Sequence, residues 1–252
     1  MVNMESHDAI AVLTLDHGKV NLIDVDLLSE LIQRLDEVEE APARAAVLTG
    51  AGASFSAGVD LFKIINGGKA YLDKFLPKLT EGLYRLFTFP KPIVAAVNGH
   101  AIAGGCLLAW SCDTCLMAQN SGRIGVVELA VGIPFPSLPL EIVRFTVPVH
   151  AFQTVVYSGR TYEPEDALKL GLVDEVVEAE NLMEQAFRLA RQLATIPPDS
   201  FATTKRLMRQ PTLDRHERFK QTIDQETARI WASKEILEVI RAYLEKTVGK
   251  KS

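Results

Sequence analysis

Residues 98–107 read Asn98-Gly-His-Ala-Ile-Ala-Gly-Gly-Cys-Leu107 and directly follow the apolar run Ile93–Val97. A short apolar run that is bounded by turn residues is typical of a buried strand. The glycine pair then leads into Cys106–Ser111, an apolar segment that predicts a buried helix. Strand, glycine turn and helix therefore follow one another here, which is the order expected in an α/β protein.

A similar arrangement lies upstream of this stretch. Ala45–Leu48 predicts a strand and feeds Gly50–Gly58, a loop of small residues that brings backbone rather than side chains to the surface. Strands are also expected at Ile10–Leu15 and Thr114–Ala118, and helices at Asp24–Glu40, Tyr71–Phe89, Glu163–Gly171 and Asn181–Ala194. Strands that alternate with helices at this spacing predict an α/β fold with parallel crossovers.

Downstream of Leu138 the strand signals become scarce, and Pro198–Lys246 offers at least two more helices. Helices without accompanying strands at the end of a chain often form a lid or an oligomer contact. The expected organisation is therefore a main domain over residues 1–197 and a helical lid or oligomerisation region over residues 198–252.

Composition excludes several classes of protein. The chain has 252 residues, of which 48% are hydrophobic and 23% charged, as in ordinary globular proteins. A net charge of −5 argues against a nucleic-acid binder, which presents a basic surface to phosphate. Residues 1–8 lack the features of a signal peptide, and no apolar run is long enough to span a bilayer. A cytoplasmic location without membrane contact is the expectation.

The common sequence motifs of nucleotide-binding proteins, serine hydrolases and zinc sites are incomplete or absent. Gly50-Ala-Gly52 begins like a dinucleotide fingerprint, but Phe55 occupies the third glycine position, and no Walker-type sequence is present. The Gly-x-Ser-x-Gly elbow is absent, so His100 has no recognisable serine partner. Cys112 and Cys115 form a Cys-x-x-Cys pair without the second pair that a structural zinc requires, and buried thiols are the simpler interpretation.

Two segments, Phe55–Leu61 and Asn98–Leu107, each follow a strand and are rich in small residues. Such turns can direct unpaired N–H groups into a cavity, and the second would add the positive end of a helix dipole. Two converging donors would make an oxyanion hole. Close packing of helix on strand explains the glycines equally well from spacing alone.

These two segments, together with Lys91–Gly99, Cys112-Asp113 and Thr161–Val177, closely resemble the crotonase-like family of enoyl-CoA hydratases and isomerases over about residues 9–248. The resemblance implies a spiral of ββα units with a C-terminal helical region that packs in homotrimers or dimers of trimers. It also implies an acyl-CoA thioester as the ligand. Coenzyme A enters as part of the substrate, and no separate cofactor or metal is expected.

The resemblance also implies the roles of individual residues. Val59 and Gly104 match the positions whose backbone N–H groups hold the thioester oxygen, and the carbonyl of Ala57 matches one that contacts the adenine. The donors are main-chain groups, so the side chain at position 59 does not matter to this role. The remaining positions expected to contact the substrate are Gly58, Asp60, Leu61, Gly105 and Leu107.

Two carboxylate positions distinguish the reactions of this family. Its hydratases use two glutamates to activate water; here the first position is Leu107 and the second falls on Glu128. A leucine cannot move a proton, whereas a single carboxylate suffices to shift one from C2 to C4 of a 3-enoyl thioester. The pattern is similar to that of the Δ3,Δ2-enoyl-CoA isomerases. Apolar neighbours, namely Val126, Val127, Leu129 and Leu107, are expected to raise the pKa of Glu128.

Two alternatives stay open at this point. One is a hydratase, or another crotonase-type reaction, that recruits an acid from elsewhere, and the Pro-rich segment Gly132–Pro136 departs from the usual loop in a way that could reshape the pocket. The other is a protein that binds acyl-CoA without turning it over.

Overall fold

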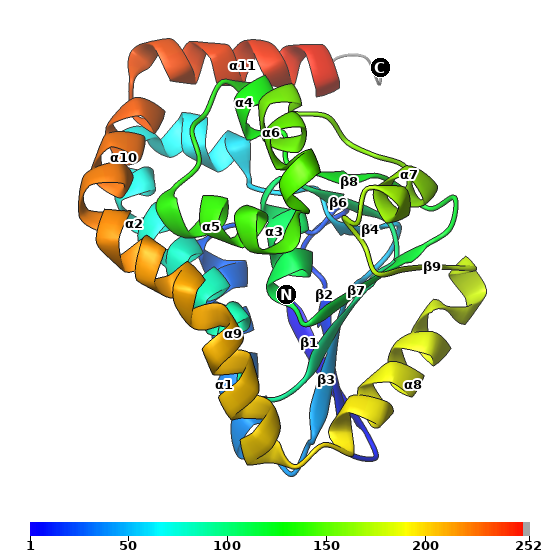
Figure 1. The fold of residues 1–252 in the computed structure, drawn as a ribbon. Coiled ribbons are helices and arrows are strands. Elements are labelled where there is room, and N and C mark those ends of the chain that lie inside the picture. The colour runs from blue at the N-terminus through cyan, green and yellow to red at the C-terminus, as the bar shows by residue number, and fades with distance from the viewer. Residues whose placement is uncertain (249–252) are drawn as a thin grey trace.

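Two sheets organise the chain, whose computed structural model describes residues 1–248 (Figure 1). The larger sheet has the strand order β1-β2-β3-β5-β7-β9, with bounds Val2–His7, Ile10–Leu15, Ala45–Gly50, Ile93–Val97, Thr114–Ala118 and Glu175–Val177. The smaller sheet has the order β4-β6-β8, with bounds Ser54–Ser56, His100–Ile102 and Ile124–Gly125. Only the pairing of β1 with β2 is antiparallel among the described strands.

The chain alternates between the two sheets as it advances. β3, β5 and β7 each enter the large sheet and are followed by β4, β6 and β8 in the small one. A helix completes each unit: α2 at Leu61–Phe87, α3 at Gly104–Ser111 and α4 at Glu128–Val131. The expected spiral of ββα units is thereby confirmed.

The large sheet is covered on both faces, which explains why its strands are apolar throughout. Side chains alternate along β3, so Ala45 and Val47 face α8 (Leu182–Ala194) while Ala46 and Leu48 face the main core. Figure 1 shows α8 on one side of this sheet and the other long helices on the opposite side.

Helix boundaries that carry a local signal agree with the sequence. Asp24 caps α1 (Val25–Glu40) by accepting a hydrogen bond of 2.8 Å from the N–H of Leu27. Pro164 occupies the first turn of α7 (Pro164–Lys169), where its missing N–H costs nothing. The remaining helices of this region are α5 at Ser137–Thr146 and α6 at Val149–Ser158, and a 3₁₀ turn, η1, lies at Ala179–Asn181.

Several elements differ from the prediction; β4, for example, lies within the segment Gly50–Gly58 that was expected to be a loop. Three further differences have a clear physical reason. Strand β1 was not expected, since only Val2 of its residues is buried and the strand shows no apolar pattern. Helix α2 begins at Leu61 rather than Tyr71, because it continues across a kink at Gly68, which has a φ of 52°. Helix α3 begins at Gly104 instead of Cys106, so the glycine pair forms its first turn.

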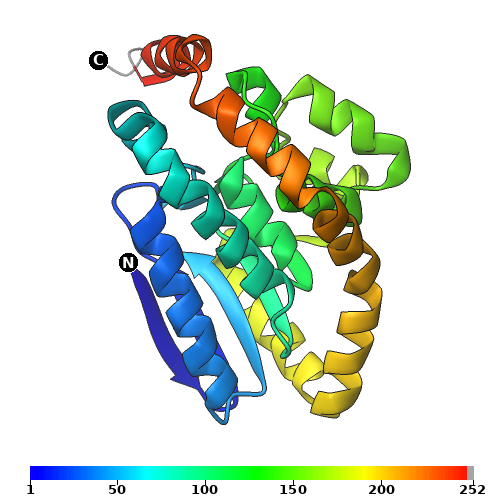
Figure 2. The same ribbon diagram turned by 90° about the vertical axis from the view of Figure 1, so that its left-hand side faces the viewer.

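Residues 198–248 form four helical elements, which pack on the core. They are α9 at Pro198–Phe219, the π-helical turn η2 at Lys220–Asp224, α10 at Gln225–Trp231 and α11 at Lys234–Val248. In the view of Figure 2, α9 and α10 run along the edge of the molecule opposite α1 and β1. Leu213, Trp231 and Ile240 belong to the main hydrophobic core, so these helices share the interior of the spiral. Within residues 1–248, none of the helices combines the length and apolar character needed to cross a bilayer.

Candidate active site

The two small-residue turns meet because the strands before them are neighbours. Strands β4 and β6 pair in parallel, with Ser54 opposite His100, so the segments that follow them leave the sheet side by side. A Cβ at Gly58 would lie 2.6 Å from the carbonyl oxygen of Ile102 and 3.5 Å from the nitrogen of Gly104. Gly58 also has a φ of +91°, so glycine is required here on both counts.

The backbone fixes the direction of the Val59 amide. The residues on either side of it bond to Ile23: the Gly58 oxygen accepts at 2.8 Å and the Asp60 nitrogen donates at 2.9 Å. Successive N–H groups of an extended segment point in opposite directions, so the N–H of Val59 faces away from Ile23. It donates no hydrogen bond to any residue in the described part of the chain.

The N–H of Gly104 also lacks a hydrogen-bond acceptor among the described residues. Gly104 is the first residue of α3, and N–H groups in the first turn have no acceptor within the helix. None of the described residues outside the helix accepts its proton either. The preceding residue, Ala103, has a φ of 50°, a conformation that an L-residue adopts only where its surroundings impose it. The turn therefore presents a donor that the fold leaves unused.

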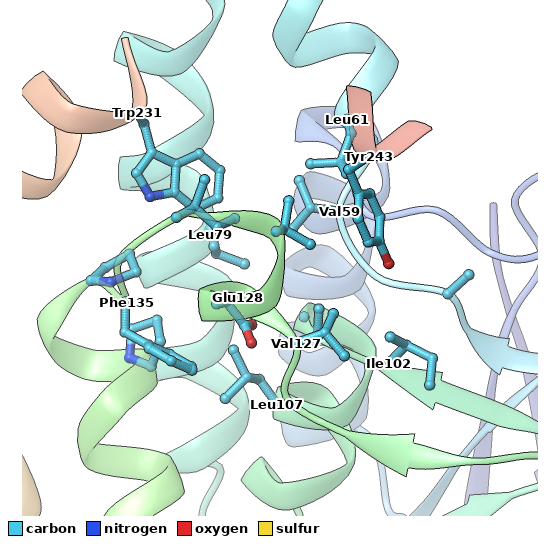
Figure 3. Close-up of a pocket in the computed structure, with 17 residues that line it drawn as sticks. Val59, Leu61, Leu79, Ile102, Leu107, Val127, Glu128, Phe135, Trp231 and Tyr243 are labelled. Carbon is cyan, nitrogen blue, oxygen red and sulfur yellow. The ribbon is translucent and has the colours of Figure 1, made fainter. Parts of the chain in front are cut away.

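Val59 and Gly104 both line a cavity that spans about 610 Å³ of space, part of which is open solvent at its mouth. Its walls come from distant parts of the chain (Figure 3), among them Val59, Leu61, Leu79, Ile102, Leu107, Val127, Phe135, Trp231 and Tyr243. Apart from Glu128 and Tyr243, the side chains labelled in that view carry no titratable group. A largely apolar cavity with a few polar groups is the usual form of a small-molecule site.

Most of the residues proposed from the sequence reach this cavity. Ala57, Val59, Leu61, Gly104, Leu107 and Glu128 all line it. Three others do not form its lining. Gly58 and Gly105 lie in the contact between the turns, where a Cβ at Gly105 would be 2.3 Å from the oxygen of Ser56. Asp60 caps α2 by accepting from the N–H of Lys63 at 3.0 Å. Their contribution to the site is to shape its backbone.

Glu128 is the only carboxyl group among the cavity-lining residues of the described chain. This residue is 6% exposed, and its Oε2 atom has no hydrogen-bond partner within residues 1–248. Burial raises the pKa of Glu128 to about 7, and the backbone N–H groups of Glu128 and Val127 offset part of that rise. The expected direction is confirmed. One predicted neighbour was wrong, because Leu129 is 41% exposed and points away from the core.

Trp231 and Tyr243 are among the residues of the cavity wall that sequence reasoning missed. Trp231 comes from α10 and Tyr243 from α11, and both reach the site across more than a hundred residues of chain. Burial raises the pKa of Tyr243, which keeps its phenol protonated. No spacing rule connects a helix near the C-terminus with a turn near residue 59, so only the folded structure reveals these contacts.

Metal and thiol chemistry find no support among the described residues. No cluster of three or more His, Cys, Asp or Glu side chains is suited to hold a metal ion within residues 1–248. The three cysteines are free and buried, and burial raises the pKa of the Cys112 thiol to about 12. A thiol with a raised pKa is a poor nucleophile and a poor metal ligand.

Residues 5–250 match the model of the enoyl-CoA hydratase/isomerase family. The chain belongs to this family. A putative enoyl-CoA hydratase from Thermus thermophilus is 33% identical to it over 253 residues, covering 98% of both chains. The mitochondrial enoyl-CoA delta isomerase 1 of Rattus norvegicus is 31% identical over 254 residues, covering 100% of this chain and 88% of its own length.

Solved structures of enoyl-CoA hydratase/isomerase proteins show the same fold. The human mitochondrial Δ3,Δ2-enoyl-CoA isomerase superposes with a TM-score of 0.94 at 28% identity, over 100% of this chain and 99% of that one. The crotonase-like fold is therefore established for this family member. Its relatives carry the names of both isomerases and hydratases, so the side chains in the cavity have to distinguish the two reactions.

Proposed function

We propose that this protein is a Δ3,Δ2-enoyl-CoA isomerase that moves a proton from C2 to C4 of a 3-enoyl thioester. The observation that carries the proposal is the pairing of one buried carboxyl group, Glu128, with an apolar residue, Leu107, in the same cavity. A hydratase of the paired-carboxylate type needs a second acid, and Leu107 cannot supply it.

In this mechanism the Glu128 carboxylate removes a proton from C2, and negative charge develops on the thioester oxygen. The N–H groups of Val59 and Gly104 are the proposed donors to that oxygen. Both residues line the cavity, and neither N–H has an acceptor in the described chain, which supports the proposal. Loss of one donor of this kind typically costs about 3 to 4 kcal/mol of transition-state stabilisation.

The protonated Glu128 then returns the proton to C4, and the double bond comes to lie between C2 and C3. One group suffices for both transfers because the acid formed in the first step is the donor in the second. A pKa of about 7 suits this exchange, since a group that titrates near the working pH is present in both forms. The apolar walls keep water from competing for the enolate.

A direct assay tests the proposal with two substrates. With purified protein and 3-hexenoyl-CoA we expect the absorbance of the conjugated thioester to rise, and with crotonyl-CoA we expect no loss of that absorbance. Among the described residues that line the cavity, Tyr243 carries the other titratable side chain, so the Tyr243→Phe variant is a matched control. Rapid hydration of crotonyl-CoA that disappears in Tyr243→Phe would instead favour a hydratase using a recruited acid.

The pH dependence of the reaction follows from the raised pKa of Glu128. The carboxylate is the active form on the free enzyme, so kcat/KM should rise about tenfold per pH unit below pH 7 and level off above it. Initial rates with 3-hexenoyl-CoA between pH 5 and pH 9 measure this profile. A profile that is flat over this range would remove Glu128 from the role of base.

Three further statements stay predictions. They are a homotrimer or dimer of trimers, a cytoplasmic location and the division of the chain at residue 197. A protein that binds acyl-CoA but converts no enoyl isomer remains the alternative from outside enzyme chemistry, and the two-substrate assay decides against it if either substrate is converted.

A further inference from the structure

A second hollow lies directly beside the cavity of Glu128. We call it the outer groove; it spans about 1300 Å³ of space, part of which is open solvent, between α2 and the segment from His216 to Ala228. Its apolar wall is formed by Leu72, Leu76 and Pro77 of α2. Among the described residues, Pro136 lines both spaces, so the outer groove and the inner cavity meet at this residue.

The separating segment, residues 134–137, is held by hydrogen bonds from the C-terminal helices. Trp231 donates from Nε1 to the oxygen of Pro134 at 2.9 Å, and Thr227 donates from Oγ1 to the oxygen of Phe135 at 3.3 Å. The N–H of Ser137 donates to Oδ1 of Asp224 at 2.7 Å. Each anchoring group comes from a helix that also walls the outer groove or the inner cavity.

The last contact of this segment is buried. The hydroxyl of Ser137 lies 2.7 Å from Nδ1 of His216 and donates to Oδ2 of Asp224 at 3.0 Å. Ser137 is 6% exposed and His216 is 4% exposed. Hydrogen bonds shielded from water are costly to open, because the groups left behind have no other partner. Residues 134–137 therefore form a fixed wall at the point where the two spaces meet, and we call this wall the partition.

The position of residues 134–137 relative to Glu128 bears on the path that an acyl chain could take. In Figure 3, Phe135 and Trp231 stand on one side of Glu128, while Ile102 and Tyr243 stand on the other. An acyl group whose carbonyl lies at Val59 and Gly104 would pass Glu128 and meet Phe135 and Pro136. Pro136 cannot swing aside easily, since its ring fixes φ and the next residue is bonded to Asp224.

We propose that residues 134–137 close the acyl-binding space and limit this enzyme to short acyl chains. The inference rests on the proposed function only in assuming that the inner cavity receives the acyl group. Burial of each further methylene would strengthen binding about fourfold. Methylenes that cannot pass the partition gain none of this, so a long chain binds no better than a short one.

Binding of saturated acyl-CoAs tests the proposal without any turnover. We expect the Kd values of hexanoyl-CoA and dodecanoyl-CoA for the full-length protein, measured by titration calorimetry, to differ by less than about tenfold. Dodecanoyl-CoA that binds more than about tenfold tighter would overturn the partition. If neither compound binds, the proposed function fails instead, so the two failures are distinguishable.

Two variants open the partition in different ways. Pro136→Ala removes most of the ring between the two spaces, and Thr227→Val removes the hydroxyl that holds Phe135 while keeping the side-chain shape. Both should increase the preference for dodecanoyl-CoA over hexanoyl-CoA, by about tenfold or more in Pro136→Ala. Thr227→Val carries the test if Pro136→Ala does not fold. An unchanged preference in a folded variant contradicts the proposal.

A variant that fills the outer groove tests whether a long acyl chain enters it. Ala228 lines the groove but not the inner cavity, so Ala228→Trp narrows the groove alone. In the wild-type background it should leave the ratio of the two Kd values unchanged. In the Pro136→Ala background it should abolish the gained preference. If the double variant keeps the preference for dodecanoyl-CoA that Pro136→Ala gained, the long acyl chain does not enter the outer groove.

Discussion

Replacing Glu128 with glutamine is expected to lower kcat for the isomerisation of 3-hexenoyl-CoA by about 100- to 10,000-fold. The amide keeps the size of the side chain but can neither remove the proton at C2 nor return it at C4. No other carboxyl group lines the cavity within the described chain, so no neighbouring acid can take over. The conjugated-thioester absorbance measures the loss. Activity within about threefold of wild type would exclude Glu128 from the reaction.

The same variant should be more stable than the wild type, which separates loss of chemistry from loss of folding. The folded protein holds the Glu128 proton up to a pKa of about 7, whereas the unfolded chain releases it near 4.5. Between these values the folded state binds more protons, so wild-type stability falls as the pH rises. Glutamine does not titrate. The difference in free energy of unfolding between Glu128→Gln and the wild type should therefore grow between these two pKa values. It should reach about 3 kcal/mol above pH 7, measured by urea unfolding.

The parts of the site that could be predicted are those carried by short local patterns. Val59 and Gly104 lie in segments of small residues that directly follow strands, and adjacent parallel strands bring such segments together. Glu128 was placed by resemblance rather than by periodicity, since a four-residue helix such as α4 leaves no repeat to detect. The sequence alone would have allowed a surface position for it.

The parts that could not be predicted depend on contacts between distant segments. Trp231 and Tyr243 line the cavity because α10 and α11 pack over α2 and α4. Strand β1 escaped notice for a related reason: it lies at the edge of the sheet with most side chains exposed, and its pairing with β2 is not encoded in an apolar pattern. Pairing with a neighbouring strand determines such a strand when its own residues show no preference for one.

A buried ionic cluster joins α9 to the spiral. Asp113 accepts from Lys205 at 2.8 Å, from Arg209 at 3.0 Å and from the N–H of Ile93 at 2.8 Å. Arg209 also donates to the carbonyl oxygens of Phe87 and Ser111, the last residues of α2 and α3. A cation at the carboxyl end of two helices is favourable, and these contacts give Asp113 a structural role.

Asp113→Asn should destabilise the fold by about 3 to 5 kcal/mol at pH 6, because it leaves two buried cations without their shared anion. The side chains of Lys205 and Arg209 are 6% and 4% exposed, so water cannot replace the lost carboxylate. Urea unfolding measures the change. The matched control is Asp73→Asn, which breaks an exposed ion pair with Lys69 and should have little effect.

The size of this penalty should itself depend on pH. Burial lowers the pKa of Lys205 to about 8 in the wild type, and the charge of Asp113 offsets part of that shift. Without Asp113 the folded-state pKa of Lys205 falls further, so the variant sheds this proton at a lower pH while its unfolded chain keeps it. The unfolded state then binds more protons, and stability of the variant rises with pH. The difference from wild type should therefore shrink as the pH approaches 8. A penalty that stays constant from pH 6 to pH 8 would mean that the loss does not act through the charge of Lys205.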